Sequence, residues 1–412
     1  MLAWTLLLFV TGELPADGHQ PEPGPPVGFA EAVAIAKGAP ALVASEAALT
    51  RRAELTAQVP WLTFNPALIG QPGVRRLAQG AVGPEGYVGI MQELSLAGAG
   101  PSRQQAARAE LEADRMDHLA LRRLVTLNAA QAWFSLWVAQ TALAVATEEL
   151  VLTREWDGKV LRGAASGGFT RVDVAVANAY RAEAELAVLS LQGEVFVRGV
   201  ALNRALGLDA SRPAAAAREL PEIEEPAEAH DDERVLAQAS SGPGPRAGVA
   251  HVAAERARGV ELETMKGASL QVGALGWREG TGDLAAVATL QLSVPLFERA
   301  QRERSANAAS TSKAEGRAAS ALLEERAERL DALHEVEHSA EVHKALDERL
   351  VPATRTALEG IERRFNAGEA TAQDLVLARR ALLSAQARLV RARADVAWAR
   401  FRLATLVQEV VR

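Results

Sequence analysis

Two histidines flank a short acidic stretch in the second half of the chain, as His334, Glu335 and His338. On a helix this H-E-x-x-H spacing puts both imidazoles on one face, where they can hold zinc while the glutamate acts as the general base of a peptidase. A catalytic zinc needs a third protein ligand. The nearest histidine, His343, lies about 180° around the helix from His334, so it cannot join them on one rod.

The residues around this motif belong to a long polar helix rather than to a catalytic domain. Glu324-Glu325-Arg326 precedes the motif and Asp347-Glu348-Arg349 follows it. A zinc metalloprotease is therefore a remote alternative, and we expect no enzyme, no cofactor and no metal site. The 412 residues include no cysteine, which excludes disulfides, thiolate metal sites and a cysteine nucleophile.

Composition narrows the class of protein further. The formal net charge is -7, so the chain lacks the basic face that displaces counterions from phosphate, and we expect no nucleic-acid partner. Only 4% of the residues are aromatic, while Ala, Leu, Arg and Glu are abundant. This composition is typical of long packed helices.

A turn motif occurs twice, about 200 residues apart. Each copy has the pattern Gly-x-x-Thr-x-x-Asp and precedes an Ala-rich apolar run. Glycine suits the left-handed residue that ends one helix, threonine the N-cap of the next, and the aspartate three residues later completes a capping box. The pattern predicts helix, tight turn, helix at both places, with these residues: Gly167, Thr170, Asp173, Gly368, Thr371 and Asp374.

A long helical stretch precedes each turn. At 1.5 Å per residue, a run of about 64 residues is roughly 95 Å long, so it needs helical partners along its length. In each half, two shorter helices stacked end to end would match the long one. The predicted long helices are 102–165 and 298–366, and the predicted partners are 29–58 with 170–206 and 231–265 with 371–411.

The last helix carries an unbroken heptad pattern. Large residues recur every seven positions and alternate with a series that is mostly alanine, which allows close antiparallel contact. A soluble coiled-coil scaffold protein would have the same pattern and remains an alternative. The two series are Leu375, Leu382, Leu389, Val396 and Leu403, and Ala378, Ala385, Ala392, Ala399 and Leu406.

Residues 284–296 alternate with a period of two over about 13 positions, the length and pattern of a tilted membrane-spanning strand. Leu290, Leu292 and Val294 are on the apolar face and are predicted to face lipid, whereas Gln291 is on the opposite face. Further strands are predicted at 61–68, 87–96 and 269–277. Trp61, Phe64, Tyr87, Trp277 and Phe297 would suit an aromatic girdle at the membrane interface.

Four strands cannot close a barrel alone, and open edges are not tolerated in lipid, so the chain is expected to oligomerise. Three chains would supply about twelve strands, within the range of known barrels.

The long helices and the four short strands together predict a fold class that is mainly α with a small β part. The apolar stretch at 2–10 predicts an export signal, and no other segment approaches the roughly 20 uninterrupted apolar residues of a spanning helix.

The predicted organisation has four parts. Residues 1–27 are a leader and N-terminal extension, and 28–212 form a first repeat of helix, strand pair, long helix, turn and helix. An acidic, proline-rich linker at 213–230 joins it to a second repeat at 231–412.

The chain resembles the TolC-like outer-membrane efflux family from about Phe29 to Val411. The likeness is carried by the two turns with their Ala-rich helices, by the strand end Leu292-Ser293-Val294-Pro295-Leu296-Phe297, and by the helix end at 202–207. The stretch 91–98, with Gln92-Glu93 before a glycine-rich turn, looks like the branch that serves heavy-metal pumps.

This resemblance implies a passive exit duct in the cell outer membrane with a large periplasmic portion. The strands of a homotrimer would form a barrel in outer-membrane lipid, and the helices a tunnel of approximately 100 Å. It also implies a periplasmic adaptor protein and an inner-membrane pump as partners. If the turns are the periplasmic tip, Asp173 and Asp374 of three chains would place six carboxylates at a constriction that favours cations.

Overall fold

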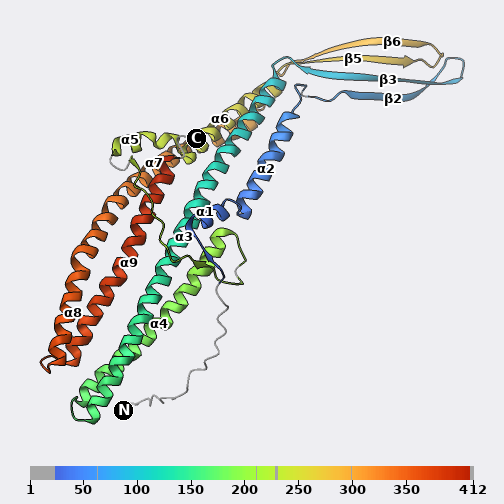
Figure 1. Ribbon diagram of the computed structural model, residues 1–412. Helices are drawn as coiled ribbons and strands as arrows, with labels where there is room; N and C mark the ends of the chain where they lie inside the picture. Colours follow the sequence, from blue (N-terminus) through green and yellow to red (C-terminus); the bar gives the residue numbers. More distant parts are fainter. Residues whose placement is uncertain (1–23, 63, 210, 228–230, 298, 409–412) are drawn as a thin grey trace, which may run out of the picture.

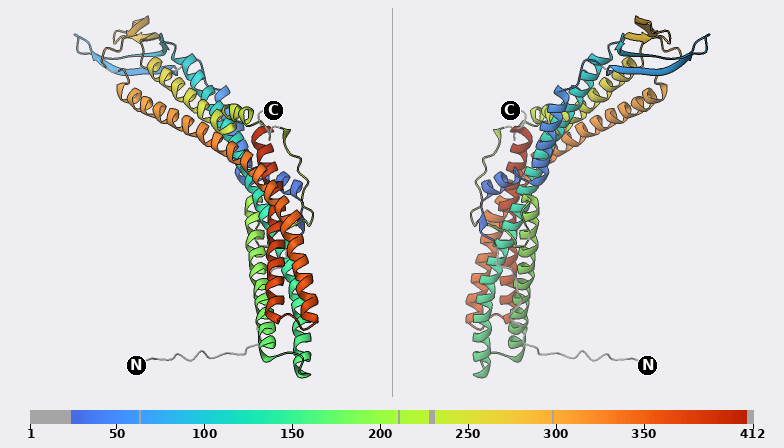
Figure 2. Two further views of the ribbon diagram at one scale, coloured as in Figure 1. Left: turned by 90° about the vertical axis from the view of Figure 1, so that its left-hand side faces the viewer. Right: turned by 90° about the vertical axis from the view of Figure 1, so that its right-hand side faces the viewer.

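The computed structural model describes residues 24–62, 64–209, 211–227, 231–297 and 299–408. The predicted export signal lies outside these residues. Long helices run side by side along one direction, with a four-stranded sheet at one end and two hairpin turns at the other (Figures 1 and 2). The prediction of a mainly helical fold with a small β part is confirmed.

Each half of the chain is built around one long helix. α3 has 67 residues, which corresponds to about 100 Å. It packs on α4 towards the turn and on α2 and α6 towards the sheet. The helices of the first half are α1 (Phe29–Ala36), α2 (Pro40–Ala57), α3 (Ala99–Ala165) and α4 (Arg171–Leu206). Those of the second half are α5 (Asp232–Ala237), the short η2 (Gln238–Ser241), α6 (Pro243–Met265), α7 (Gln301–Ala345), the π-turn η3 (Leu346–Leu350), α8 (Val351–Asn366) and α9 (Ala372–Gln408).

Two helices predicted as continuous are broken, both at a residue that precedes proline. Ala39 has ψ 140° before Pro40, and Gly242 has ψ 153° before Pro243. The proline ring disfavours helical geometry at the preceding residue, so the helix stops there. The predictions of single helices at 29–58 and 231–265 were wrong on this point.

The long helix of the second half continues through Pro352 because a π-helical turn lies just before it. Pro352 cannot donate a hydrogen bond to the preceding turn. The five-residue π-turn η3 lies immediately before α8 and accommodates this loss. The predicted helix at 298–366 is therefore one rod with a local defect, and its regular part begins at Gln301.

The sheet has the antiparallel order β2-β3-β5-β6, so that the two repeats meet at the β3–β5 pair. β2 and β6 are its free edges. A separate two-stranded pair joins β1 (Pro26–Val27) in parallel to β4 (Ala215–Ala216). The four main strands are β2 (Ala67–Arg76), β3 (Val82–Ser95), β5 (Ser269–Arg278) and β6 (Leu284–Ser293).

Two strand boundaries differ from the predicted ones. The first strand begins at Ala67 rather than at Trp61, since Pro60 and Pro66 cannot donate to a ladder. The last strand ends at Ser293, just before Val294 and Pro295. Val294 therefore lies beyond the paired part of β6.

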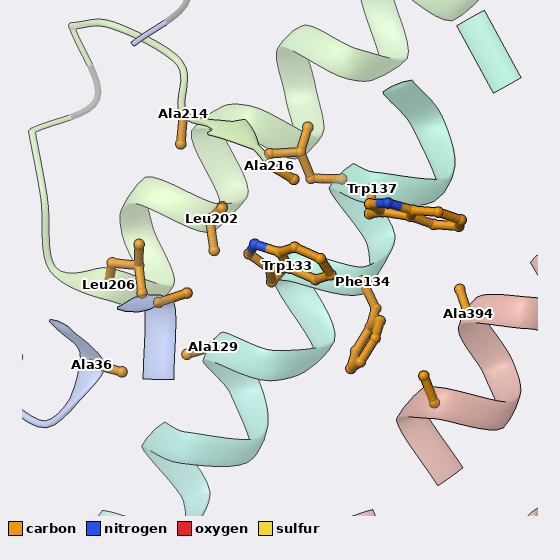
Figure 3. Packing of buried hydrophobic residues seen from close by; sticks show 13 residues of the cluster. Ala36, Ala129, Trp133, Phe134, Trp137, Leu202, Leu206, Ala214, Ala216 and Ala394 are labelled. Carbon is orange, nitrogen blue, oxygen red and sulfur yellow. The ribbon is translucent and has the colours of Figure 1, made fainter. Parts of the chain in front are cut away.

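The main core lies midway along the helices, where β1 and β4 cover α3. Trp133, Phe134 and Trp137 of α3 pack with Leu202 and Leu206 of α4 (Figure 3). The indole N–H of Trp133 donates to the carbonyl of Val27 at 2.8 Å, and that of Trp137 to the carbonyl of Arg218 at 3.0 Å. A buried indole N–H requires an acceptor, so the first bond fixes β1 and the second fixes the linker against the long helix.

The heptad pattern of α9 is only partly a buried seam. Leu375, Ala385, Ala392, Ala399 and Leu403 are buried, as expected. Leu382, Leu389 and Val396 are half-buried in the single chain. The heptad pattern therefore identifies the face of α9 that packs on other helices, but not all of this face is buried within one protomer.

One helical stretch of the described residues, Phe29–Ala57, is long and apolar enough to cross a membrane by length and composition. It comprises α1 and α2 with the break at Ala39. Glu31, Lys37 and Glu46 interrupt this stretch, so it is not the uninterrupted apolar run of a spanning helix.

Candidate functional site: the paired turns and the sheet

The two hairpin turns have the same geometry. Gly167 and Gly368 take the left-handed conformation, with φ 82° and 76°. Such a φ is accessible to glycine at little cost and closes the preceding helix. Figure 2 shows both turns at the same end of the molecule, opposite the sheet.

Both capping boxes are formed as predicted. The backbone N–H of Thr170 donates to Asp173 at 2.9 Å, and the N–H of Asp173 donates to the Thr170 hydroxyl at 3.2 Å. Thr371 and Asp374 repeat these bonds with the same two lengths. The prediction of helix caps is thus confirmed, whereas the constriction stays a prediction.

The cap bonds lower the pKa of both aspartates below the ordinary value of 3.8. For Asp173 the main cause is the hydrogen bond from the Thr170 side chain, and for Asp374 the bond from the Thr371 backbone. The backbone N–H of Ala372 also lowers the pKa of Asp173, so the two turns lie within reach of one another. The carboxylates are therefore charged at neutral pH, and their capping contribution is present above the ordinary pKa and lost as pH falls through the lowered one.

An apolar cluster holds the two hairpins together behind the turns. Trp156 of α3 and Tyr180 of α4 pack with Leu375 of α9. Phe169 and Phe365, one from each turn region, stack with ring centroids 5.7 Å apart. The tips of α3–α4 and α8–α9 therefore form one packed unit.

Polar contacts reinforce this junction. Arg380 of α9 forms an ion pair with Glu183 of α4, and its guanidinium lies over the Tyr180 ring at 5.7 Å from the centroid. The Tyr180 hydroxyl donates to Glu149 at 2.8 Å. Burial, followed by the charge of Glu149, raises the pKa of Tyr180. Sequence reasoning missed these residues, because each contact joins two different helices and that of Arg380 joins the two halves of the chain.

The predicted lipid-facing residues are exposed in the single protomer. Leu290 is 72% and Leu292 60% exposed, and Val294 is exposed just beyond the strand. In the sheet Leu290 pairs with Val272, and Gln291 with Gln271, so apolar and polar residues lie on alternate faces. The lipid and lumen assignment of these faces remains a prediction.

The H-E-x-x-H motif has no peptidase geometry. His334 and His338 are exposed on α7, with nearly parallel rings 5.5 Å apart. The carboxylate of Glu335 forms an ion pair with Arg402 at 2.8 Å. The described residues contain no group of three or more His, Cys, Asp or Glu side chains placed to hold a metal ion.

Removing one cap hydroxyl should destabilise the tip. We expect Thr371→Ala to cost about 0.5–2 kcal/mol of helix-end stability, since the N–H of Asp374 loses its acceptor. Faster amide hydrogen exchange at the start of α9 would measure this effect. Thr371→Ser keeps the hydroxyl and is the matched control; equal exchange in both variants would contradict the cap's contribution.

Residues 267–407 match the family model for outer membrane efflux proteins. No curated protein matches the chain. Among solved structures, a membrane protein from Pseudomonas aeruginosa superposes with TM-score 0.74 at 19% identity, covering 92% of this chain and 89% of that chain. CusC superposes with TM-score 0.70 at 15% identity, covering 92% and 91%. The outer membrane protein VceC from Vibrio cholerae gives 0.70 at 18%, covering 92% and 95%.

The solved structures share the fold of this chain, long helical hairpins with a four-stranded sheet at one end. The family match lies within the second repeat, from residue 267 to residue 407, and the shared fold covers nearly the whole chain. The second half of the chain therefore resembles outer membrane efflux proteins.

Proposed function

We propose that three copies of this chain form the exit duct of a tripartite efflux system. The observation that carries the proposal is the sheet at the end of helices about 100 Å long. Its edge strands β2 and β6 are unpaired within the protomer, and its apolar side chains are exposed. Pairing with the strands of two further copies would satisfy these edges and place the apolar face in lipid.

The dimensions of the sheet support a membrane position. Ten residues of β5 extend about 33 Å at 3.3 Å per residue, enough to cross an apolar band of about 25 Å. Tyr87 and Trp277 pair with one another near the distal end of the sheet. Trp61 and Phe297 are exposed near its helical end. These aromatic residues would lie at the two membrane interfaces.

The opposite end of the duct would meet the other components. The paired turns are separated from the sheet by the length of α3, far enough to reach across much of the periplasm. We assign the periplasmic adaptor to this tip and the inner-membrane pump to the position beyond it.

Cell fractionation tests the proposed function. We expect the protein in outer-membrane fractions as a trimer that resists mild detergent and dissociates on heating. A soluble monomer or dimer would instead favour the coiled-coil scaffold, and peptide hydrolysis abolished by Glu335→Gln would favour the peptidase.

The tip carboxylates are proposed to line a constriction in the closed duct. Changing Asp173 and Asp374 together to Ala would remove six carboxylates from a trimer. We expect higher single-channel conductance in planar bilayers and weaker block by multivalent cations, because the ligands for those cations are lost. Thr170→Ser with Thr371→Ser keeps the charges and should behave as the unmodified channel. Unchanged block in the alanine variant would place the narrowest point elsewhere.

A metal-ion cargo is a narrower proposal. It is supported by the strand end at Gln92 and Glu93, which resembles the branch of the family that serves heavy-metal pumps. Gln92 donates to the carbonyl of Phe64, which ties this strand end to the chain entering the sheet. Expression in a strain that lacks its own duct would test the cargo. Restored tolerance to metal salts and not to drugs would support metal export, and the reverse would exclude it.

A further inference from the structure

The helices of one protomer form a layer with two free edges. Towards the sheet the order of packed neighbours is α2, α3, α6 and α7, and towards the turns it is α4, α3, α9 and α8, with α4 also in contact with α9 near the tip. α2 and α4 therefore form one edge, and α7 and α8 form the other (Figure 1). If copies join around an axis, each edge must meet the opposite edge of the next copy, a heterologous contact that closes into a ring.

The outward face of α7 is set by its buried residues. Glu325, Arg329 and Val336 are buried against neighbouring helices. At 100° per residue, the face opposite to them carries an exposed stripe. This stripe, called the α7 edge below, consists of Leu323, Leu330, His334, Glu337, His338 and Glu341.

The outward face of α4 follows in the same way. Leu202 and Leu206 are buried against α3. The opposite face, called the α4 edge below, exposes Leu186, Val197 and Arg204. Val197 is 62% exposed, so this edge presents an apolar side chain next to its charged ones.

Contacts within the protomer place the two edges at the same height along the duct. Phe134 of α3 packs with Leu202 of α4 on one side and with Trp398 of α9 on the other. One turn further along α9, Arg402 pairs with Glu335 of α7. Rotation about the duct axis preserves height, so residues 197–204 of one copy lie level with about 334–341 of the next.

The charges on the two edges are complementary. Arg204 has no ion pair with any residue that the structure describes, and the same holds for Glu337 and Glu341. We propose that the α4 edge of one copy docks on the α7 edge of the next, with Arg204 facing Glu337 and Val197 beside Glu341. This seam rests on the proposed ring of copies and names the surfaces that close it. Opposite charges facing one another would fix the register of the two helices.

Cysteine cross-linking tests the seam cleanly, because the chain has no cysteine of its own. Val197→Cys with Glu341→Cys should give covalent dimers and trimers in the outer membrane after oxidation or with a linker about one helical turn long. The matched control is Val197→Cys with His343→Cys, which has nearly the same height but lies on the opposite face of α7. This control should remain monomeric in denaturing gels.

The outcomes separate the seam from the proposed function. Membrane trimers that are cross-linked through position 343 and not 341, or through neither, would overturn the seam while leaving the duct intact. Absence of the unmodified protein from the outer membrane would overturn the duct itself. As a second measurement, Arg204→Glu should lower the dissociation temperature of the trimer, and adding Glu337→Arg should restore it. Lack of restoration would also contradict the proposed register.

Discussion

Changing Glu325 to Gln is expected to lower the free energy of unfolding of the helical region by about 3–5 kcal/mol. Glu325 is buried on α7 and accepts two hydrogen bonds from Arg123 of α3, at 3.0 and 2.6 Å. It also accepts one from Arg329 at 2.9 Å. The substitution removes the counter-charge of the fully buried Arg329, whereas Arg123 still has Glu328 within 3.5 Å.

The position of Arg329 makes the loss large. Its side chain is 0% exposed and also donates to the carbonyls of Val235 and Leu406. This one guanidinium therefore ties α7 to the segment of α5 and to the end of α9. Denaturant unfolding followed by circular dichroism would measure the change.

Glu328→Gln is the matched control for this prediction. Glu328 also lies near Arg123, at 3.5 Å, but its side chain is 50% exposed, and a surface pair of this kind contributes at most about 1 kcal/mol. Similar destabilisation by both variants would show that burial of Glu325 is not the decisive factor. A well-packed apolar replacement of the whole group should recover stability, since it removes all the buried charges together.

Leu290→Arg is expected to impair membrane assembly by about 2–4 kcal/mol if the residue faces lipid near the midplane. Leu290 lies towards the middle of the membrane-sized sheet and pairs with Val272. A cation there must leave water for hydrocarbon. The yield of heat-modifiable trimer in outer-membrane fractions would report the effect.

The adjacent residue provides the control. Gln291→Arg changes the opposite face of the same strand and should assemble almost normally, because a lumen-facing cation stays hydrated. If both variants assemble equally, the assignment of Leu290 and Leu292 to the lipid face is wrong.

The sequence by itself determined the features that depend on neighbours along the chain. The capping boxes at Thr170 and Thr371 and the left-handed glycines before them formed as predicted, since each involves residues only a few positions apart. The strand at 284–293 could be predicted in the same way, because the alternation of apolar and polar residues is a local property of the sequence. Together with the repeated long helices, these features were enough to identify the fold.

The tertiary structure decided everything that depends on which helices meet. The sequence marks Glu325 and Arg329 as ordinary polar positions of a coiled coil, yet α3 and the end of α9 bury them. In the same way, the pairing of Arg380 with Glu183 joins residues almost 200 positions apart. Helical periodicity predicts that a helix has an apolar and a polar face. Only the tertiary structure determines which other helix packs on each face. Burial, and with it the energetic value of each charge, is therefore a property of the assembled helices.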